Sequence, residues 1–587
     1  MNYHERAARE IHEHQPSQTV TPIMRKLVAD SAAMLARGRD DARTRAEAAR
    51  QHAIDHLDDL HEQVRKQFEA RGIGYHRAET ASAAVRQVRS LLGNAKRVAK
   101  SKTMVGEEVG LTHALRSAGI DVLETDIGEY IVDIEGRGPS HITAPALHLN
   151  RARIREMLAR TGADLPDDDP TRLSQHIRDV VGDYFRDCDA AITGANAVVA
   201  SSGRLMIVEN EGNVSLGVSH PRLHIVITGL EKVVADEARA LAVLEVLAPS
   251  ATAQPLTSFS HFVADPLPGQ ERHVIFVDHG RSRILRDARY RDILKCIRCG
   301  ACMNACPVYR AAGGLSYGSP YMGPIGAVVS PLLWRDGRYA DLPYASSLCG
   351  RCTEVCPAGI PLHRMLLDLR ADAVSRGQVA GRAERAAWRA WALGFGGATR
   401  ARAISALGRI GLRNAGRALR ARGSDRDPRL LPEVSPERDP ANLDPVTPPK
   451  ETAQPPLPGS NVIGIDEVMP DDPLELFRQR AGALGVPVLG RVEPRKGDRE
   501  VRAEAAVAST GSVLLVGDAA ARRPLLAARR VVVRVDHRSV VGYPGDLAPW
   551  LGDGDALILT GASRTADIEK QLVRGIHGSE ELVVVLE

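Results

Sequence analysis

The segment that decides the fold class reads C-I-R-C-G-A-C-M-N-A-C-P at residues 296–307, and C-G-R-C-T-E-V-C-P follows at residues 349–357. These two runs hold seven of the eight cysteines in the 587-residue chain. Thiolates are the preferred ligands of iron–sulfur clusters, and the C-x2-C-x2-C spacing lets a tight loop place three sulfurs on three corners of one cubane. The runs therefore predict an α-helical, ferredoxin-type domain that holds two 4Fe-4S clusters.

The spacing also divides the cysteines between the clusters. In such paired runs, the fourth cysteine of one run usually binds the cluster of the other run. The first cluster is therefore expected to take Cys296, Cys299, Cys302 and Cys356. The second is expected to take Cys306, Cys349 and Cys352. Clusters that exchange ligands in this way lie close together, which suits the relay of single electrons better than a purely structural role.

The second cluster is short of one thiolate, because Ser346 stands three residues before Cys349, where a fourth cysteine is expected. The open corner can bind Ser346, Ser347, water or a group from outside the chain. Alternatively, this cluster can lose one iron and become a 3Fe-4S cluster.

Zinc is the alternative metal for clustered cysteines. Zinc sites use pairs of C-x2-C with four ligands for each ion. Seven cysteines in two runs that each end in Cys-Pro fit that pattern badly.

The eighth cysteine, Cys188, lies far from both runs, and we interpret it as a small buried residue.

The bulk composition is that of a soluble globular protein, with 44% hydrophobic residues, 26% charged residues and a net charge of +4. This small charge gives no sign of nucleic-acid binding. No apolar run approaches the roughly 18 residues of a membrane span, and the start of the chain lacks an apolar signal segment. We expect a cytoplasmic protein, whose thiols stay reduced and available to metals.

Composition and periodicity divide the chain into six parts. An apolar helical stripe is formed by Leu57, Leu60, Val64 and Phe68. Strand-like and helical stretches alternate after this stripe. Closely spaced prolines indicate a linker before the last part of the chain. The expected parts are an N-terminal helical region (1–74), an α/β domain (75–284), the two-cluster domain (285–370), a basic helical region (371–425), a Pro-rich linker (426–465) and a second α/β domain (466–587). The basic region is interpreted either as a solvated surface helix or as a docking segment for an acidic partner or an anionic membrane surface.

The last part repeats the first α/β domain. A-N-A-V-V-A-S-S-G-R-L-M-I-V-E-N at residues 195–210 matches A-E-A-A-V-A-S-T-G-S-V-L-L-V-G-D at 503–518 in seven of sixteen positions. Two further apolar blocks follow in the same order and at similar spacing in both copies. The sequence thus predicts two related α/β domains on either side of the cluster region.

Other cofactor motifs do not stand out. No Gly-x-Gly-x-x-Gly lies between a strand and a helix, and no phosphate-binding P-loop is found. Without nicotinamide or flavin signatures, the chain is expected to be one electron carrier within a larger dehydrogenase.

The motifs resemble those of the lactate utilization protein B family over about residues 20–425. The resemblance rests on the cysteine runs, on G-P-I-G-A (323–327) between them, and on K-S-K-T-M (100–104), E-T-D-I-G-E-Y (124–130) and V-E-N-E-G-N (208–213). One departure is Ser201-Ser202-Gly203-Arg204, where the family pattern is Glu-Thr-Gly-Thr. Three cysteines in the second run are the family's pattern, so Ser346 is not a departure.

The tail, with S-R-T-A-D-I-E at 563–569, resembles a shortened lactate utilization protein C, so the chain is similar to a B–C fusion. The resemblance implies two LUD-type α/β domains, remotely similar to NagB and CoA transferases, that flank the cluster domain. It also implies oxidation of L-lactate to pyruvate by an A–B–C complex. The expected partners are a cysteine-rich A-type subunit and an unknown electron acceptor.

Two functions remain open from the sequence. The chain is expected to be the electron-transfer subunit of an oxidoreductase of the L-lactate dehydrogenase type, with catalytic residues unknown. The alternative is a small-molecule-binding or CoA-transferase-like LUD protein with structural or redox-sensing clusters. Glu209-Asn210-Glu211-Gly212 faintly resembles the transferase glutamate loop, although a strand end and turn is the simpler interpretation.

Overall fold

The computed structural model describes residues 2–378, 382–395 and 472–587, the last range with gaps at 494, 497, 518–521, 563, 566–567, 569–572, 575 and 578. The Pro-rich linker expected at 426–465 and most of the basic helical region lie outside these residues. Residues Met1–Ala373 and Met469–Glu587 form one unit, and Val374–Val468 form a second, which includes α19 (Arg382–Phe395). Among the described residues, no helix is both long and apolar enough to cross a membrane.

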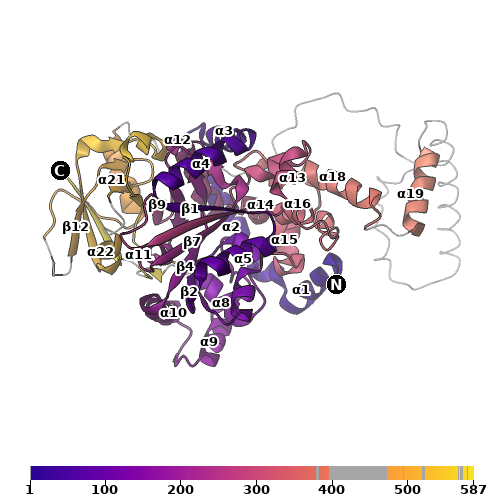
Figure 1. Cartoon of the computed structure of the whole chain (residues 1–587), viewed down its shortest axis with the longest axis horizontal. Coiled ribbons are helices and arrows are strands. Elements are labelled where there is room, and N and C mark those ends of the chain that lie inside the picture. Colours follow the sequence, from indigo (N-terminus) through magenta and orange to yellow (C-terminus); the bar gives the residue numbers. More distant parts are fainter. Residues whose placement is uncertain are drawn as a thin grey trace, which may run out of the picture. The chain divides into compact units, whose positions relative to one another are not determined.

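A six-stranded parallel sheet forms the centre of the first α/β domain (Figure 1). Its strands, in spatial order, are β1 (Ile73–Ala78), β10 (Glu271–Val277), β7 (Leu223–Gly229), β4 (Ala190–Thr193), β2 (Arg97–Lys100) and β3 (Asp121–Glu124). Parallel sheets need cover on both faces, and the central strands β7 and β4 are accordingly almost entirely buried. Val226 and Val274 face the stripe of α4 (Leu57–Ala70), whereas Ile225 and Ile275 pack in the opposite core with α5 (Ala81–Leu92).

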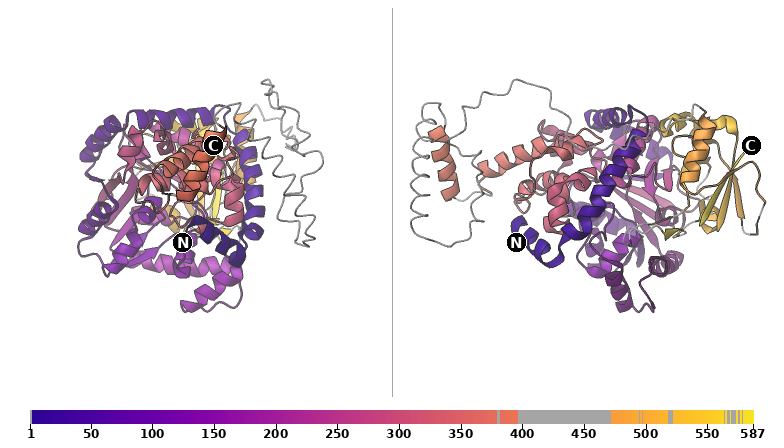
Figure 2. Two further views of the ribbon diagram at one scale, coloured as in Figure 1. Left: turned by 90° about the vertical axis from the view of Figure 1, so that its right-hand side faces the viewer. Right: turned by 180° about the vertical axis from the view of Figure 1, so that it is seen from behind.

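A second sheet of eight strands joins the first α/β domain to the tail. Its order is β16 (Val540–Val541), β13 (Ala505–Val507), β14 (Ser512–Val516), β17 (Ala556–Leu559), β9 (Phe259–Val263), β6 (Leu205–Glu209), β5 (Ala197–Val199) and β8 (Val233–Val234). The two halves meet where β9 and β17 pair antiparallel, with Phe262 opposite Ala556 and Phe259 opposite Leu559. The tail, yellow in Figure 2, thus continues a sheet of the first domain.

The strand order of this sheet is symmetric about the β9–β17 pair. Outward from the centre it runs β9-β6-β5-β8 on one side and β17-β14-β13-β16 on the other. A four-stranded parallel sheet of β11 (Val488–Leu489), β20 (Glu581–Leu586), β15 (Arg530–Val535) and β12 (Asp498–Arg502) repeats the order of β1-β10-β7-β4. The repeat seen in the sequence therefore coincides with two halves of like topology. They share one sheet, a closer association than the two separate flanking domains expected from the sequence.

Arg204 fastens the tail to the first half from the β5–β6 turn. Its side chain is buried, and its guanidinium donates to the carbonyls of Leu551 (3.2 Å), Gly552 and Gly554 (2.7 Å). Arg204, one of the three positions that depart from the family pattern, therefore contacts the tail.

Helices surround these sheets and form the cluster region. The remaining α-helices are α1 (Tyr3–His14), α2 (Pro16–Ala36), α3 (Ala42–Asp55), α6 (Met104–Glu108), α7 (Leu111–Ser117), α8 (Ile127–Glu135), α9 (Arg151–Arg160), α10 (Pro170–Asp187), α11 (Asn213–Ser219), α12 (Glu237–Thr252), α13 (Arg281–Arg286), α14 (Ala301–Ala305), α15 (Pro307–Ala312), α16 (Gly323–Leu333), α17 (Arg351–Glu354), α18 (Leu362–Ser375), α21 (Pro473–Ala483) and α22 (Arg522–Ala527). In Figure 1, α2 lies beside α14 and α15. Its buried Val20 and Met24 join the same apolar core as Cys302 and Cys306, so the N-terminal helical region is part of the cluster domain's packing.

Candidate iron–sulfur site and the adjoining cavity

The two cysteine runs fold into loops of the same backbone shape. Cys299 lies between Arg298 (φ 63°) and Gly300 (φ 80°), and Cys349 lies between Leu348 (φ 58°) and Gly350 (φ 80°). A short helix follows each glycine, α14 in the first run and α17 in the second. Left-handed conformations are uncommon outside glycine, so two such residues at matching positions mark a specific tight turn.

Cys296 and Ser346 hold the same place in these two loops. The backbone N–H of Arg298 donates to Cys296 Sγ (3.4 Å), and the backbone N–H of Leu348 donates to Ser346 Oγ (3.1 Å). Ser346 is therefore the structural counterpart of Cys296, as the spacing predicts. Whether its oxygen binds iron is a separate matter that stays a prediction.

Four cysteines line one small apolar cavity: Cys296, Cys299, Cys302 and Cys356. These are the four residues expected to hold the first cluster. Burial raises the pKa of Cys302 well above its usual value, and the neighbouring thiols of Cys296, Cys299 and Cys356 raise it further. Iron binding would take these thiols as thiolates, so the donor set fits a cluster with four cysteine ligands.

The other three cysteines form a neighbouring group. Burial raises the pKa of Cys352 to about 11, and the nearby thiols of Cys306 and Cys349 add to the shift. Cys349 is exposed, so this group is more open to solvent than the first. Cys188 lies apart at the end of α10, where its thiol donates to the carbonyl of Phe185 (3.6 Å).

Two buried basic side chains, Arg50 of α3 and Lys232 of the first α/β domain, hold the first loop in place. Arg50 donates to the carbonyls of Leu294 (3.0 Å) and Lys295 (3.2 Å), and Lys232 Nζ donates to the carbonyl of Cys296 (3.0 Å). Positive charge beside a cluster stabilises its reduced, more negative state. Both side chains hold the loop in place, and Arg50 adds a positive charge beside it, whereas burial lowers the pKa of Lys232 to about 7.

A buried ion-pair chain continues from this loop. Arg298 pairs with Glu231 (3.5 Å), Glu231 with Arg281 (2.6 Å), and Arg281 with Glu108 (2.7 Å). Tyr321 OH donates to Glu108 at 2.6 Å from the segment between the cysteine runs. Truncating one member would leave a buried charge without its partner, which is strongly destabilising.

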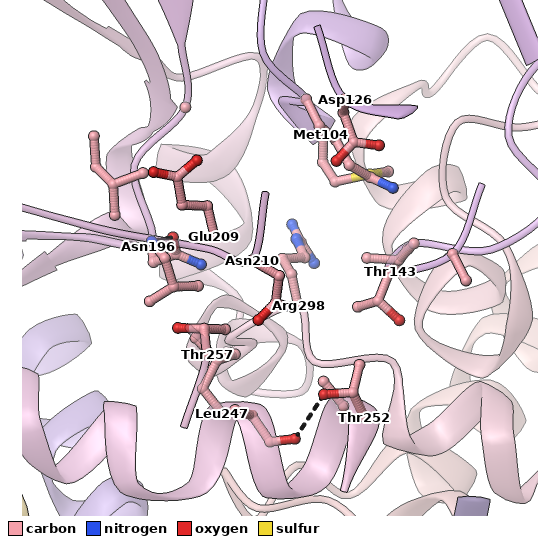
Figure 3. A pocket seen from close by; sticks show the side chains of 18 of the residues that line it. Met104, Asp126, Thr143, Asn196, Glu209, Asn210, Leu247, Thr252, Thr257 and Arg298 are labelled. Carbon is pink, nitrogen blue, oxygen red and sulfur yellow. Dashed lines mark hydrogen bonds between the residues drawn. The ribbon is translucent and has the colours of Figure 1, made fainter. Parts of the chain in front are cut away.

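A cavity of about 640 Å³ lies on the other side of the Cys296 loop. Ile297 and Arg298 line both this cavity and the small one among the cysteines. Figure 3 shows Arg298 pointing into the middle of the large cavity, between Glu209 and Thr143, with Asp126 and Met104 near one end. The loop is thus the shared wall between the candidate cluster site and a cavity of small-molecule size.

The carboxylates at this cavity are already engaged. Glu209 accepts hydrogen bonds from the backbone N–H groups of Val214 (2.7 Å) and Ser215 (2.8 Å) and from His261 (2.8 Å). Burial opposes its ionisation, but these hydrogen bonds outweigh that effect and hold the pKa of Glu209 below its usual value. Glu211 accepts from the backbone N–H of Ile127 (3.1 Å). The Glu209–Gly212 segment therefore caps the N-termini of α11 and α8. This favours the interpretation of the segment as a strand end and turn over a catalytic glutamate loop.

Several residues of this cavity were not found by sequence reasoning. Lys102, Lys232, Arg298 and Arg564 all line it, and Arg564 comes from the tail, where its backbone N–H donates to the carbonyl of Asn210 (2.8 Å). Three of them lie in motifs quoted above, Arg298 in the cysteine run, Lys102 in K-S-K-T-M and Arg564 in S-R-T-A-D-I-E, but none of these motifs indicated a cavity. Arg564 reaches the cavity only through the long-range pairing of the two halves.

Comparisons with known proteins agree with this architecture. A model of the LUD domain matches residues 61–285, and a model of the 4Fe-4S dicluster domain matches residues 292–360. The fold and site therefore define an iron–sulfur protein that combines a LUD domain with a ferredoxin-type 4Fe-4S domain. This confirms the prediction of a ferredoxin-type domain and of a LUD domain ahead of it.

Similar proteins indicate the family within this class of iron–sulfur proteins. Lactate utilization protein B of Bacillus velezensis is 42% identical over 364 residues, which is 60% of this chain and 76% of that protein. Lactate utilization protein B 2 of Bacillus mycoides is 42% identical over 363 residues, with the same coverage. The chain belongs to the lactate utilization protein B family. A crystal structure of a DUF162 family protein from Deinococcus radiodurans matches 38% of this chain and 97% of its own length, at 16% identity and a TM-score of 0.21.

Proposed function

We propose that this chain is the electron-transfer subunit of a complex that oxidises L-lactate to pyruvate. The observation that supports this most directly is the cavity lined by Cys296, Cys299, Cys302 and Cys356, with the second cysteine group beside it. Oxidation of lactate releases two electrons and two protons, and each cluster carries one electron at a time. A pair of adjacent clusters is suited to receive those electrons in sequence.

We propose the same cluster ligands that the cysteine spacing predicts. The first cluster takes the four cysteines of the small cavity, and the second takes Cys306, Cys349 and Cys352 with an open fourth corner. Anaerobically purified chain should then hold about seven to eight iron atoms. Stoichiometric zinc without iron would contradict the assignment.

The domain layout is also a proposal: a B-type LUD half, a two-cluster domain, and a C-type LUD half joined through the Pro-rich linker. The like strand orders of the two halves support the B–C fusion. In this arrangement the A-type subunit and the final electron acceptor bind as separate partners, in the reducing environment of the cytoplasm. Docking to a membrane surface would use the basic region 371–425, where Trp388 and Trp391 of α19 are exposed.

The test is cluster reduction by lactate. Purified chain is mixed anaerobically with L-lactate, with and without an A-type subunit, and the loss of cluster absorbance is followed. We expect reduction only with the partner, since the sequence has no recognised motif for a hydride-accepting cofactor. Steady lactate oxidation by the chain alone, or no reduction in the reconstituted mixture, would contradict the proposed role.

The alternative is a transferase-like activity of the LUD half, with Glu209 as its nucleophile. The hydrogen bonds that hold Glu209 at the start of α11 count against this role, because a nucleophilic carboxylate needs a free face. Turnover of a CoA ester by the isolated chain would favour the alternative.

A further inference from the structure

Three parts of the chain, remote in sequence, each contribute a cation to the 640 Å³ cavity. Lys102 follows β2 of the first half, Arg298 belongs to the cysteine loop, and Arg564 lies in β18 (Arg564–Thr565) of the tail. Among the described residues, no hydrogen-bond partner is found for Lys102 Nζ, Arg298 Nη1, or Nε and Nη2 of Arg564, all of which are buried. Lys102 keeps an ion pair with Glu129 at 3.2 Å. Buried donors without acceptors are unusual and call for an explanation.

The acids of the cavity do not satisfy these cations. The side-chain oxygens of Glu209, Glu211 and Asp126 accept from backbone N–H groups at the starts of α11 and α8. Helix N-termini carry partial positive charge and offer free N–H donors, so they compensate these carboxylates. Arg298 keeps its ion pair with Glu231 at 3.5 Å, as Lys102 keeps its pair with Glu129. What remains are the unsatisfied donors Lys102 Nζ, Arg298 Nη1, and Nε and Nη2 of Arg564, which an acceptor-rich anion would complete.

Size and lining restrict the anion further. Ligand cavities in proteins measure roughly 300–1,000 Å³, and this one falls in that range. Apolar side chains form much of its wall, among them Met104, Ile142 and Leu247. A bare inorganic ion would leave this apolar surface uncovered, whereas an organic anion would cover it and meet the cations with its charged group.

We propose that this cavity binds an organic anion, a carboxylate or a phosphate ester, through Arg564, Arg298 and Lys102. The inference rests on the proposed function in one respect: a ligand held by Arg298 lies beside the loop of the first cluster. Two sources share this chemistry, namely a 2-hydroxy or 2-oxo acid and a phosphate-bearing redox carrier such as flavin mononucleotide.

The experiment uses the full, cluster-loaded chain under anaerobic conditions, without partner or turnover. Isothermal titration is carried out with L-lactate, pyruvate, flavin mononucleotide and riboflavin, the last being the same ring system without phosphate. We expect saturable binding of at least one of the anions and at least tenfold weaker binding of riboflavin than of flavin mononucleotide if the carrier is the ligand. Binding of lactate or pyruvate alone identifies the hydroxy-acid source.

The variant Arg564→Gln removes one cation from the cavity, and Arg574→Gln is its matched control. Arg574 lies directly opposite Arg564 in the neighbouring strand β19 (Val573–Arg574), is exposed, and does not line the cavity. We expect Arg564→Gln to weaken binding at least tenfold, Arg564→Lys to restore part of it, and Arg574→Gln to change it less than twofold. Because Arg564 is remote from the cysteines in sequence, iron content should be equal in all three variants.

Two results would overturn the site: no saturable binding of any of the three anions, or equal weakening by Arg564→Gln and Arg574→Gln. Neither result depends on lactate oxidation, which the reconstituted complex tests separately. Conversely, binding that requires Arg564 in a chain whose clusters lactate cannot reduce would keep the site and reject the proposed function.

Discussion

Ser346 and Cys296 occupy equivalent positions in the two loops, and their side chains differ in one atom, oxygen in place of sulfur. Each side chain accepts from the backbone N–H two residues later, that of Leu348 for Ser346 and that of Arg298 for Cys296. A hydroxyl is a weaker iron ligand than a thiolate, because soft thiolates are preferred by iron–sulfur clusters. One corner of the second cluster is therefore expected to be the weak one.

Oxidation should reveal this difference. Air exposure of wild-type protein should release one iron from the second cluster and produce the paramagnetic signal of a 3Fe-4S cluster. Ser346→Cys should suppress that signal and retain the iron, because the new thiol completes the ligand set. Electron paramagnetic resonance and iron analysis measure both effects.

Ser347→Cys is the matched control, since Ser347 is the next residue and is exposed. It should leave the three-iron signal unchanged. If the wild type forms no three-iron species and both variants behave alike, the fourth ligand comes from elsewhere.

The grouping of the other cysteines is tested by single substitutions. Cys299→Ser should remove the first cluster, and with it about four of about eight iron atoms, because a buried corner loses its thiolate. Cys188→Ser should remove none, since Cys188 lies at the end of α10. Iron analysis and absorbance near 400 nm, roughly where sulfur-to-iron charge transfer occurs, compare the two variants. Equal iron loss in both would contradict the grouping.

Much of the cysteine site is predictable at this scale because cysteine spacing directly limits geometry. A C-x2-C loop leaves little freedom in where its sulfurs lie, so the spacing groups Cys299 with Cys302, and the ligand exchange usual in paired runs adds Cys356. Arg564 lies in the S-R-T-A-D-I-E motif of the tail, but that motif does not indicate that its side chain enters a cavity. Its place in the cavity depends on which strands meet across the two halves, and that pairing is determined by packing between residues about 300 positions apart.

At the scale of elements, the β9–β17 pair joins the two halves into one sheet. β9 would otherwise be an edge strand with unpaired backbone groups, and β17 covers it. Asp555 supports the junction, because its carboxylate accepts from the backbone N–H of Ala264 at 2.5 Å. The sequence repeat predicted that the halves are related, but not that they share a sheet, since edge pairing leaves no local pattern.

Arg204 is the side chain to remove in order to test this junction. Arg204→Ala leaves the carbonyls of Leu551 and Gly554 without their buried donor and removes the ion pair with Glu237 at 3.4 Å. We expect a loss of about 2–4 kcal/mol in the free energy of unfolding. Hydrogen exchange should rise in 551–559 more than in β1 or β10.

Arg186→Ala serves as the control, because Arg186 is exposed and pairs only locally with Asp183. It should change the stability by less than about 0.5 kcal/mol. Unchanged exchange in 551–559 after Arg204→Ala would show that the tail is held by other contacts.

At the scale of the whole molecule, the cysteine loop connects two kinds of site. On one side, Ile297 and Arg298 close the cavity of the first cysteine group, and on the other they close the large cavity to which the tail adds Arg564. A ligand in the large cavity would therefore be separated from the first cluster by one loop. The tail contributes to function in this view by completing the wall of a site in the first half.

This view predicts that the covalent connection between the halves is dispensable once the chain has folded. A protease site inserted near residue 440, within the Pro-rich segment, should be cut without separating the two pieces, because β9 and β17 remain paired and the apolar core around Leu514 and Ile558 stays buried. Gel filtration under native conditions should show one complex.

Ile558→Pro should separate the pieces after cutting, because proline removes a donor from the centre of β17 and cannot be accommodated between two neighbouring strands. Arg529 is an exposed residue of the tail that lies outside the strands, so Arg529→Pro should leave the complex intact. If the cut wild-type chain releases its tail, the shared sheet is too weak to hold the halves together, and the cavity that contains Arg564 would then depend on the linker.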